Sequence, residues 1–230
     1  LMIMLFACKR LGSQCVGVVE GDDGLFRVSG PMPTVEQFAS YGFTLKLAVR
    51  ERLSESHFCG MVFAEDTQEN LADPAVLLAK FGWTTSERRW SNKPKMLGLL
   101  RAKALSLAYE LPGCPIARSL ALAALRLTEG SKPLYNEMDR YKLAERAYVD
   151  ILSDNIQERL SRPITMSSRE VVSRVFGVDV CTQLSVESYL DNLDTICELD
   201  HPDIIAMMKP LWFSMFEWYS EVEPTIGSSH

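Results

Sequence analysis

The sequence lacks the spacings that metal-binding and disulfide-bonded proteins use. Its six cysteines form no C-x-x-C pair, and none of the three histidines is placed to complete a zinc site with them. Such scattered cysteines favour reduced side chains in the core of a protein from a reducing compartment, and disulfides are the less favoured alternative. The chain also has no internal repeat and no low-complexity tract. The cysteines are Cys8, Cys15, Cys59, Cys114, Cys181 and Cys197.

A long hydrophobic run is also missing. The run from Leu1 to Cys8 is apolar for eight residues, whereas a membrane-spanning helix needs about 20. No basic region precedes this run, so it is not a secretory signal. It starts without an initiator Met or a helix cap. We therefore expect the chain to begin inside a buried helix that ends at Lys9-Arg10 and is stopped by Gly12.

The chain has no excess of basic residues, and its net charge is −6. The two halves differ: residues 1–134 carry 16 Lys and Arg against 13 Asp and Glu, giving +3, and residues 135–230 carry 8 against 17, giving −9. An acidic total argues against indiscriminate binding to nucleic acid but leaves room for a local basic channel. The content of 47% hydrophobic and 23% charged residues is typical of a soluble globular protein.

Two apolar runs on either side of a polar turn predict a β-hairpin. Residues 15–19 and 25–28 are mainly apolar, and the segment Glu20–Gly24 between them is rich in Asp and Gly. Asp and Gly tolerate the positive φ that tight hairpin turns require. The hairpin would therefore present two adjacent carboxylates at its tip.

A short helix and two strands are expected after the hairpin. Thr34 and Gln37 are spaced as the capping box of a helix. Residues 43–49 alternate between apolar and polar side chains as a half-buried strand does. A further β segment over residues 57–64 is expected to bend or bulge at Gly60.

Beyond about residue 72 the pattern becomes helical. Asp73 followed by Pro74 is typical of an N-cap and a first helical position. Ser167 and Glu170 are spaced as a second capping box. The expected helices cover residues 74–81, 96–111, 115–128, 136–160, 171–176, 183–199 and 203–219.

The Gly21-Asp22-Asp23-Gly24 turn allows two interpretations. It is either an ordinary turn, which is the commoner meaning of so short a motif, or a divalent-metal site. Two carboxylates on a rigid hairpin tip can hold Mg²⁺ or Mn²⁺ against substrate phosphates. Gly21 would also let a second chain approach closely. The segments that follow bear on this choice.

Three segments in this order resemble the palm of viral RNA-dependent RNA polymerases, specifically those of positive-strand RNA viruses of the noda-like and tombus-like kind. Glu20–Phe26 resembles the Gly-Asp-Asp hairpin of that family. Phe38–Lys46 is similar to the next motif, which has a helix, a glycine and a strand with a basic residue. His57–Phe63 is similar to the hairpin that steadies the end of the primer.

The resemblance implies an α+β fold in two parts. Residues 1–70 would be the C-terminal part of the palm, a three- or four-stranded antiparallel sheet with flanking helices. Residues 71–230 would be a mainly α-helical thumb with a C-terminal helical extension. Leu100–Lys103 and Pro112–Ile116 also resemble the noda-like and tombus-like group, and the likeness becomes thin beyond residue 135.

The resemblance also implies what is missing. In the family, a third metal-binding carboxylate and the residues that select the ribose come from motifs upstream of the helix with which this sequence begins. The basic fingers that guide the nucleotide lie upstream as well. We therefore expect a C-terminal fragment that does not polymerise alone.

Such polymerases catalyse the attack of a 3′-hydroxyl on a nucleotide α-phosphate, with pyrophosphate as the leaving group. Two divalent ions about 3.5–4 Å apart activate the attacking oxygen and neutralise the leaving group. By resemblance, Asp22 would be the more direct ligand of Mg²⁺ or Mn²⁺ and Asp23 an auxiliary one. Lys46 and Arg50 both fit a basic residue near the pyrophosphate, and an ordinary surface role for Lys46 is equally favoured.

Two further groups of residues would contact RNA. By resemblance, Phe58, Cys59 and Gly60 would support the primer end. A basic cluster interleaved with Trp90 contains no acidic residue and is typical of contact with an RNA backbone, although a solvated loop and helix start fits equally well. Arg101 and Lys103 lie in an otherwise apolar helix, so we expect them to face a template or product groove. The cluster consists of Arg88, Arg89, Lys93, Lys95, Arg101 and Lys103.

The partners implied by the resemblance are template and product RNA, nucleoside triphosphates, and the remainder of the polymerase with its fingers and upstream palm. The implied location is the host cytoplasm, including membrane-associated replication sites. The competing hypothesis is a non-enzymatic helical interaction protein with a structural β-hairpin. An exposed tip carrying Asp22 and Asp23 would fit the polymerase, whereas a buried tip with both carboxylates salt-bridged would fit the interaction protein. A reverse transcriptase or DNA polymerase palm is the third and least favoured alternative.

Overall fold

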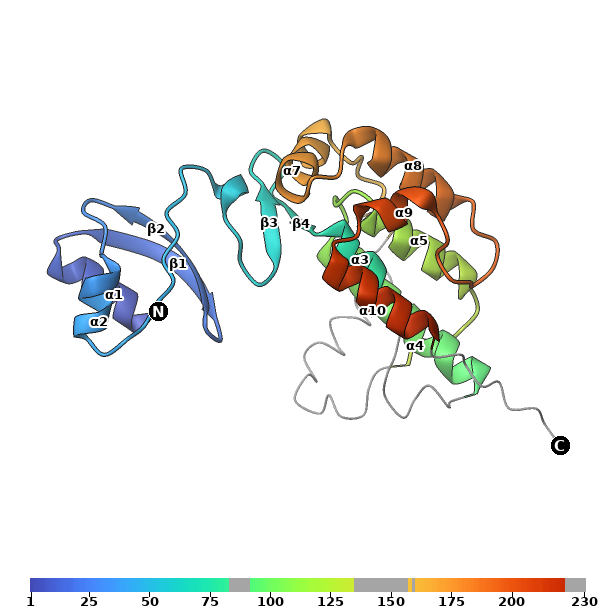
Figure 1. Ribbon diagram of the computed structural model, residues 1–230, viewed down its shortest axis with the longest axis horizontal. Helices are drawn as coiled ribbons and strands as arrows, with labels where there is room; N and C mark the ends of the chain where they lie inside the picture. Colours follow the sequence, from blue (N-terminus) through green and yellow to red (C-terminus); the bar gives the residue numbers. More distant parts are fainter. Residues whose placement is uncertain (83–91, 135–156, 159, 222–230) are drawn as a thin grey trace. The chain divides into compact units, whose positions relative to one another are not determined.

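The protein is mixed α+β, as the sequence predicts for the fold class. In this computed structural model the described part contains helices and two small antiparallel two-stranded sheets (Figure 1). The chain divides into two compact units, residues 1–63 and 64–230. The predicted helix over 136–160 lies almost entirely outside the described residues. The described residues are 1–82, 92–134, 157–158 and 160–221.

The first unit is built around the predicted hairpin, which is confirmed. Strand β1 (Gln14–Glu20) pairs antiparallel with β2 (Asp23–Ser29) (Figure 1). At the last rung Glu20 lies opposite Asp23. Only Gly21 and Asp22 remain between the strands, and Gly21 has a φ of 58°. A two-residue turn of this kind needs positive φ, which glycine adopts without strain.

A small apolar core lies between the helices and one face of this hairpin. Helix α1 (Met2–Arg10) ends where predicted, but it is only partly buried, since Met2, Leu5 and Phe6 are exposed. Helix α2 (Val35–Ser40) carries the predicted capping box between Thr34 and Gln37. A Cβ at Gly17 would lie 2.4 Å from the Phe26 ring, so the packing of Phe26 requires a glycine there. The core consists of buried Met4, Ala7, Cys8 and Phe38, with Ile3, Cys15, Phe26, Val28, Tyr41 and Leu45 packed against it.

Of the two strands predicted after the hairpin, one is wrong and the other is confirmed in part. Residues 43–49 form no strand, and no other described segment pairs with them in a ladder of backbone hydrogen bonds. Their alternation instead reflects an extended segment in which Leu45 packs against the core. The predicted β segment over 57–64 is confirmed in part: strand β3 covers Met61–Ala64, and the predicted bend is a tight turn at Cys59-Gly60 that begins before the strand.

The second sheet includes a strand that the sequence analysis missed. Strand β3 is followed by β4 (Glu69–Ala72), and the two form a sheet separate from β1 and β2. The expected single sheet of three or four strands is therefore not present among the described residues. In β4 only Leu71 is fully buried, and the short strand contains two polar residues, so its sequence has no apolar run to mark it.

Helices make up most of the second unit. Helix α4 packs against α5, α5 against α8, and α3 against α10 (Figure 1). No described helix is both long and apolar enough to cross a membrane. The helices are α3 (Pro74–Lys80), α4 (Lys93–Glu110), α5 (Ala117–Leu127), α7 (Met166–Phe176), α8 (Val180–Asp191), α9 (Pro202–Met207) and α10 (Pro210–Glu221).

Some helix boundaries differ from the predictions, because a different residue caps the helix or because a proline interrupts it. The Asp73 cap of α3 is confirmed, since its Oδ1 accepts from the Ala75 N–H at 3.0 Å. Helix α7 is capped by Thr165 rather than by Ser167, and α8 starts earlier than predicted because Asp179 caps it. The predicted helix over 203–219 is two helices, because Pro210 cannot continue the first one.

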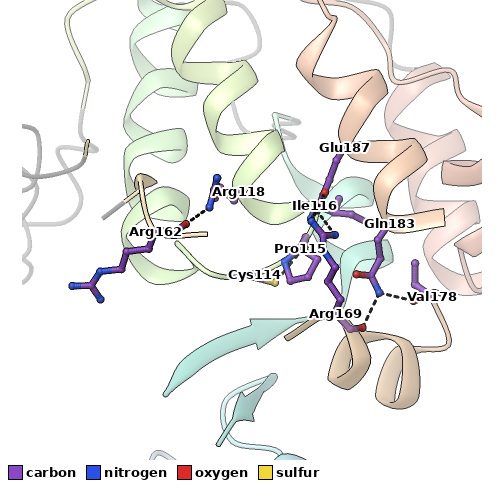
Figure 2. A network of polar contacts seen from close by, with 9 residues as sticks. All are labelled: Cys114, Pro115, Ile116, Arg118, Arg162, Arg169, Val178, Gln183 and Glu187. Carbon is purple, nitrogen blue, oxygen red and sulfur yellow. Dashed lines mark hydrogen bonds and ion pairs between the residues drawn. The ribbon is translucent and has the colours of Figure 1, made fainter. Parts of the chain in front are cut away.

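A buried polar network joins the α4–α5 connection to α7 and α8 (Figure 2). Glu187 Oε1 accepts from the Ile116 N–H at 2.9 Å, and both carboxylate oxygens of Glu187 accept from the Arg169 guanidinium at 3.1 and 2.8 Å. Gln183 Nε2 donates to the carbonyl oxygens of Arg169 and Val178 at 2.9 and 2.8 Å. Removing one member would leave buried partners without a hydrogen bond.

Replacing Glu187 with alanine should destabilise the second unit by about 3–5 kcal/mol, because it leaves the Arg169 charge and the Ile116 N–H unpaired in the interior. Glu187→Gln should destabilise less, since the amide oxygen can still accept from Ile116. Urea unfolding followed by far-UV circular dichroism measures both effects. The control is Glu170→Ala, an exposed position on α7, which should change stability by less than about 0.5 kcal/mol. Equal losses for Glu187→Ala and the control would contradict the role given to the network.

Candidate metal centre at the first hairpin turn

The two predicted metal ligands lie at the exposed tip of the first hairpin. Asp22 belongs to the turn and Asp23 is the first residue of β2, and both are exposed. Within the described part of the chain, neither carboxylate forms an ion pair with a basic side chain. Both carboxylates are thus accessible to solutes.

A second tight turn lies directly against this tip. The N–H groups of Phe58 and Met61 each donate to the other residue's carbonyl oxygen at 3.0 Å. Between them, Cys59 and Gly60 have φ angles of 52° and 76°, which is the positive pair that a two-residue I′ turn needs. The Cys59 N–H donates to Asp23 Oδ2 at 2.7 Å. The structure therefore brings together the Asp pair and the residues predicted to support the primer end.

The negative charge of the tip affects the Cys59 thiol. Its pKa is raised above the ordinary value, first by loss of solvation and then by the charges of Asp23, Glu20 and Asp22, in that order. Glu20 contributes because the two-residue turn places it opposite Asp23. The raised pKa of Cys59 thus reflects lost solvation first and the three neighbouring carboxylates second.

The side chains present fit part of a site for a hard divalent cation. Mg²⁺ usually keeps several waters and takes one or two protein carboxylates together with substrate phosphates. Asp22 and Asp23 supply such a pair. Among the described residues, however, no group of three or more His, Cys, Asp or Glu side chains could hold a metal ion. This hairpin would therefore need a further carboxylate from elsewhere to hold two ions.

The two basic residues predicted to lie near the pyrophosphate are not held at the tip. Lys46 and Arg50 are both exposed and lie in the extended segment that follows α2. Within the described residues neither is ion-paired with Asp22 or Asp23. Their catalytic role stays a prediction.

The predicted RNA-contacting cluster separates into three groups. Arg88 and Arg89 lie outside the described residues. Lys93 and Lys95 are exposed in the first turn of α4. The remaining two, Arg101 and Lys103, point from α4 to neighbouring chain segments.

Arg101 and Lys103 each bind the carbonyl oxygens at the end of a neighbouring helix. Arg101 Nη1 donates to the carbonyls of Leu125 and Thr128 at 3.0 and 3.1 Å, at the end of α5. Lys103 Nζ donates to the Lys80 carbonyl at 3.0 Å, at the end of α3, and partial burial together with the Lys80 charge lowers the pKa of its ammonium. These contacts explain two cations in the middle of α4, among mainly apolar residues. RNA contact by them stays a prediction.

Two interactions at the turn were not predicted from the sequence. Glu20 adds a third negative charge, and the backbone N–H of Cys59 is the group that binds Asp23. The position of Glu20 could have been found, because a two-residue turn at Gly21-Asp22 requires Glu20 and Asp23 to pair. No local signal reveals the Cys59 contact, since it joins residues 36 positions apart.

Comparison of the chain with protein-family models, with curated protein sequences and with solved structures found no match.

Neutralising Asp23 should increase the reactivity of Cys59. In a Cys181→Ser/Cys197→Ser background, Cys59 is the one exposed cysteine left. The Asp23→Asn change removes a charge that raises the pKa of the thiol, so the thiolate fraction below that pKa should increase. We expect the rate of reaction with a disulfide reagent to rise roughly twofold to threefold, the size of a solvent-screened interaction at short range.

The matched control is Asp194→Asn, which removes an exposed charge in the second unit. It should leave the rate unchanged. An Asp23→Asn rate no higher than that of the control would show that the carboxylate does not act on Cys59.

Proposed function

We propose that this chain is part of an RNA-directed RNA polymerase of the kind found in positive-strand RNA viruses, and that it contributes Asp22 and Asp23 to a two-metal nucleotidyl-transfer site. The observation that supports the proposal is the exposed Asp turn bonded through Asp23 to the Phe58–Met61 turn. The alternative, a structural hairpin in an interaction protein, expects a buried and salt-bridged tip. Exposure of both carboxylates therefore favours the polymerase.

In the proposed reaction the 3′-oxygen of the growing RNA forms a bond to the α-phosphorus of a nucleoside triphosphate. The bond from that phosphorus to the bridging oxygen breaks, and pyrophosphate leaves with the electron pair. The hydroxyl proton passes to solvent or to a nearby base. Divalent ions, when bound, stabilise the negative charge that develops on the attacking and leaving oxygens.

The residues of this chain have distinct tasks in that scheme. Asp22 has no hydrogen-bond partner among the described residues, so both its oxygens are available to a cation. Asp23 shares Oδ2 with the Cys59 N–H, which leaves it fewer free lone pairs and suits an auxiliary role. The turn at Phe58–Met61 would support the primer end beside this pair.

The proposal also assigns the chain a partner, the remainder of the polymerase. Part of the first unit's surface is apolar: on β1 the side chains of Val16 and Val18 are 79% and 53% exposed. They alternate with Cys15 and Gly17, which face the core side of the hairpin. An uncovered apolar sheet face of this kind is expected where another part of the same enzyme packs.

The decisive measurement is nucleotide incorporation by a complete enzyme. The chain is joined to an upstream polymerase segment containing an Asp-x₄-Asp pattern and the Ser-Gly and Asn residues of the ribose-selecting motif. Asp22→Ala should lower Mg²⁺-dependent incorporation about a hundredfold or more, because several kcal/mol of transition-state stabilisation depends on the metal. Asp194→Asn should retain activity. Full activity in Asp22→Ala would end the proposal.

A second measurement uses the 230-residue chain itself. Millimolar Mg²⁺ should accelerate the reaction of Cys59 with a disulfide reagent, since a cation bound by the carboxylates offsets the field that raises the pKa of the thiol. Mg²⁺ prefers oxygen ligands, so it should not block the sulfur directly. Asp22→Asn should reduce the acceleration, and potassium at matched ionic strength is the control. An equal acceleration in Asp22→Asn would argue against metal binding at this turn.

A further inference from the structure

A cleft with three lysines opens where the start of α4 faces the chain that follows α5. Its volume is about 710 Å³, within the range of about 300–1,000 Å³ that ligand sites occupy. The lysines are Lys93, Lys95 and Lys132, and one acidic residue, Glu129, also lines the cleft. Lys132 lies far from the basic cluster in sequence, so the fold adds it to two cations that the sequence had already marked.

The walls of this cleft are held together by backbone contacts. The Leu134 N–H donates to the Gly98 carbonyl oxygen at 2.9 Å. A Cβ at Gly98 would lie 2.7 Å from the Lys132 carbonyl oxygen, so α4 and the 130–134 segment approach this closely because residue 98 is a glycine. Arg101 binds the carbonyl oxygens of Leu125 and Thr128, which fixes the end of α5 just before the segment. The position of Lys132 is therefore set by the fold.

The positive charge in the cleft comes from side chains. All three lysines are exposed, and within the described residues none has an ion-pair partner. The helix start itself offers little to a ligand, because Asn92 Oδ1 already accepts from the Lys95 N–H at 3.1 Å and Pro94 has no N–H. Three ammonium groups against one carboxylate favour a ligand that carries several negative charges.

We infer that this cleft binds the phosphodiester backbone of single-stranded RNA, with the ammonium groups of Lys93, Lys95 and Lys132 contacting successive phosphates. The choice of RNA over other polyanions rests on the proposed polymerase function. Lysine ammonium groups act as point charges on phosphates and read no base sequence. Binding is therefore independent of sequence and decreases steeply as salt concentration rises.

The test is fluorescence anisotropy of a short 5′-labelled oligouridylate titrated with the full chain. The variant Lys93→Gln/Lys95→Gln/Lys132→Gln should lower the affinity at low salt at least about tenfold. The slope of log affinity against log salt should become smaller by about 2, since each single-strand phosphate contact contributes about 0.7. Far-UV circular dichroism checks that the variant is folded.

The matched control removes three exposed cations elsewhere, in the variant Lys9→Gln/Arg52→Gln/Arg162→Gln. It has the same net charge as the cleft variant and should keep most of the affinity and the salt slope. A second variant, Gly98→Ala, changes no charge but forces the Lys132 segment away from α4. Gly98→Ala should also weaken RNA binding. This result would show that the shape of the cleft contributes to affinity separately from its charge.

Equal affinities for the cleft variant and the charge-matched control would overturn the inference. Displacement of the RNA by inorganic phosphate at the same concentration of phosphate groups would also overturn it, since the site would then be one for free phosphate. The polymerase proposal fails separately, through full activity of Asp22→Ala. If Asp22→Ala were fully active, a loss of RNA affinity in the cleft variant would still support RNA binding by the cleft.

Discussion

The arrangement of the second unit depends on one buried carboxylate, Glu187. It lies on α8, pairs with Arg169 on α7, and accepts the N–H of Ile116 immediately before α5. Ile116 has a φ of 64°, which a β-branched residue adopts only at a cost. The hydrogen bond to a charged acceptor offsets part of that cost. The start of α5 thus meets the consecutive helices α7 and α8 at one carboxylate, and α5 in turn packs against α4, which lines the lysine cleft.

In the first unit, the position of one turn against another depends on a different kind of contact, the hydrogen bond from the Cys59 N–H to Asp23. It joins two turns that each need positive φ angles and that offer little apolar surface of their own. A single charge-assisted hydrogen bond is short and directional, so it can set the relative position of two such turns where packing cannot. The electrostatic environment of the tip follows, because the same contact brings the Cys59 thiol next to three carboxylates.

Local signals explain what could be predicted from the sequence. The hairpin, the Thr34 capping box and the Asp73-Pro74 helix start each depend on residues within a few positions of one another, and each is confirmed. The prediction of a strand over 43–49 was wrong, because alternating apolar and polar residues indicate an extended chain but do not show whether a partner strand exists. The strand β4 was missed for the opposite reason, since it has a partner but no apolar run.

The candidate sites divide in the same way. Asp22 and Asp23 could be found because they are adjacent in a turn whose shape is local. Their contact with Cys59, and the approach of Lys132 to Lys93 and Lys95, join segments separated by 36 residues in one case and about as many in the other. Such contacts depend on how helices and turns pack, and periodicity carries no information about them. Arg101 illustrates the converse: its charge is visible in the sequence, but the carbonyl groups that it binds are not.

The shared oxygen of Asp23 has a thermodynamic consequence for any cation that binds at the first turn. A cation that takes Asp23 Oδ2 as a ligand shares that oxygen with the Cys59 N–H, so cation occupancy of the turn and the geometry of residues 58–61 would be linked equilibria. Linkage is reciprocal, so any ligand whose binding depends on the geometry of residues 58–61 would change cation affinity by the same factor by which the cation changes the affinity of that ligand. The turn at residues 21–22 and the turn at residues 59–60 would thus be coupled through one backbone amide, that of Cys59.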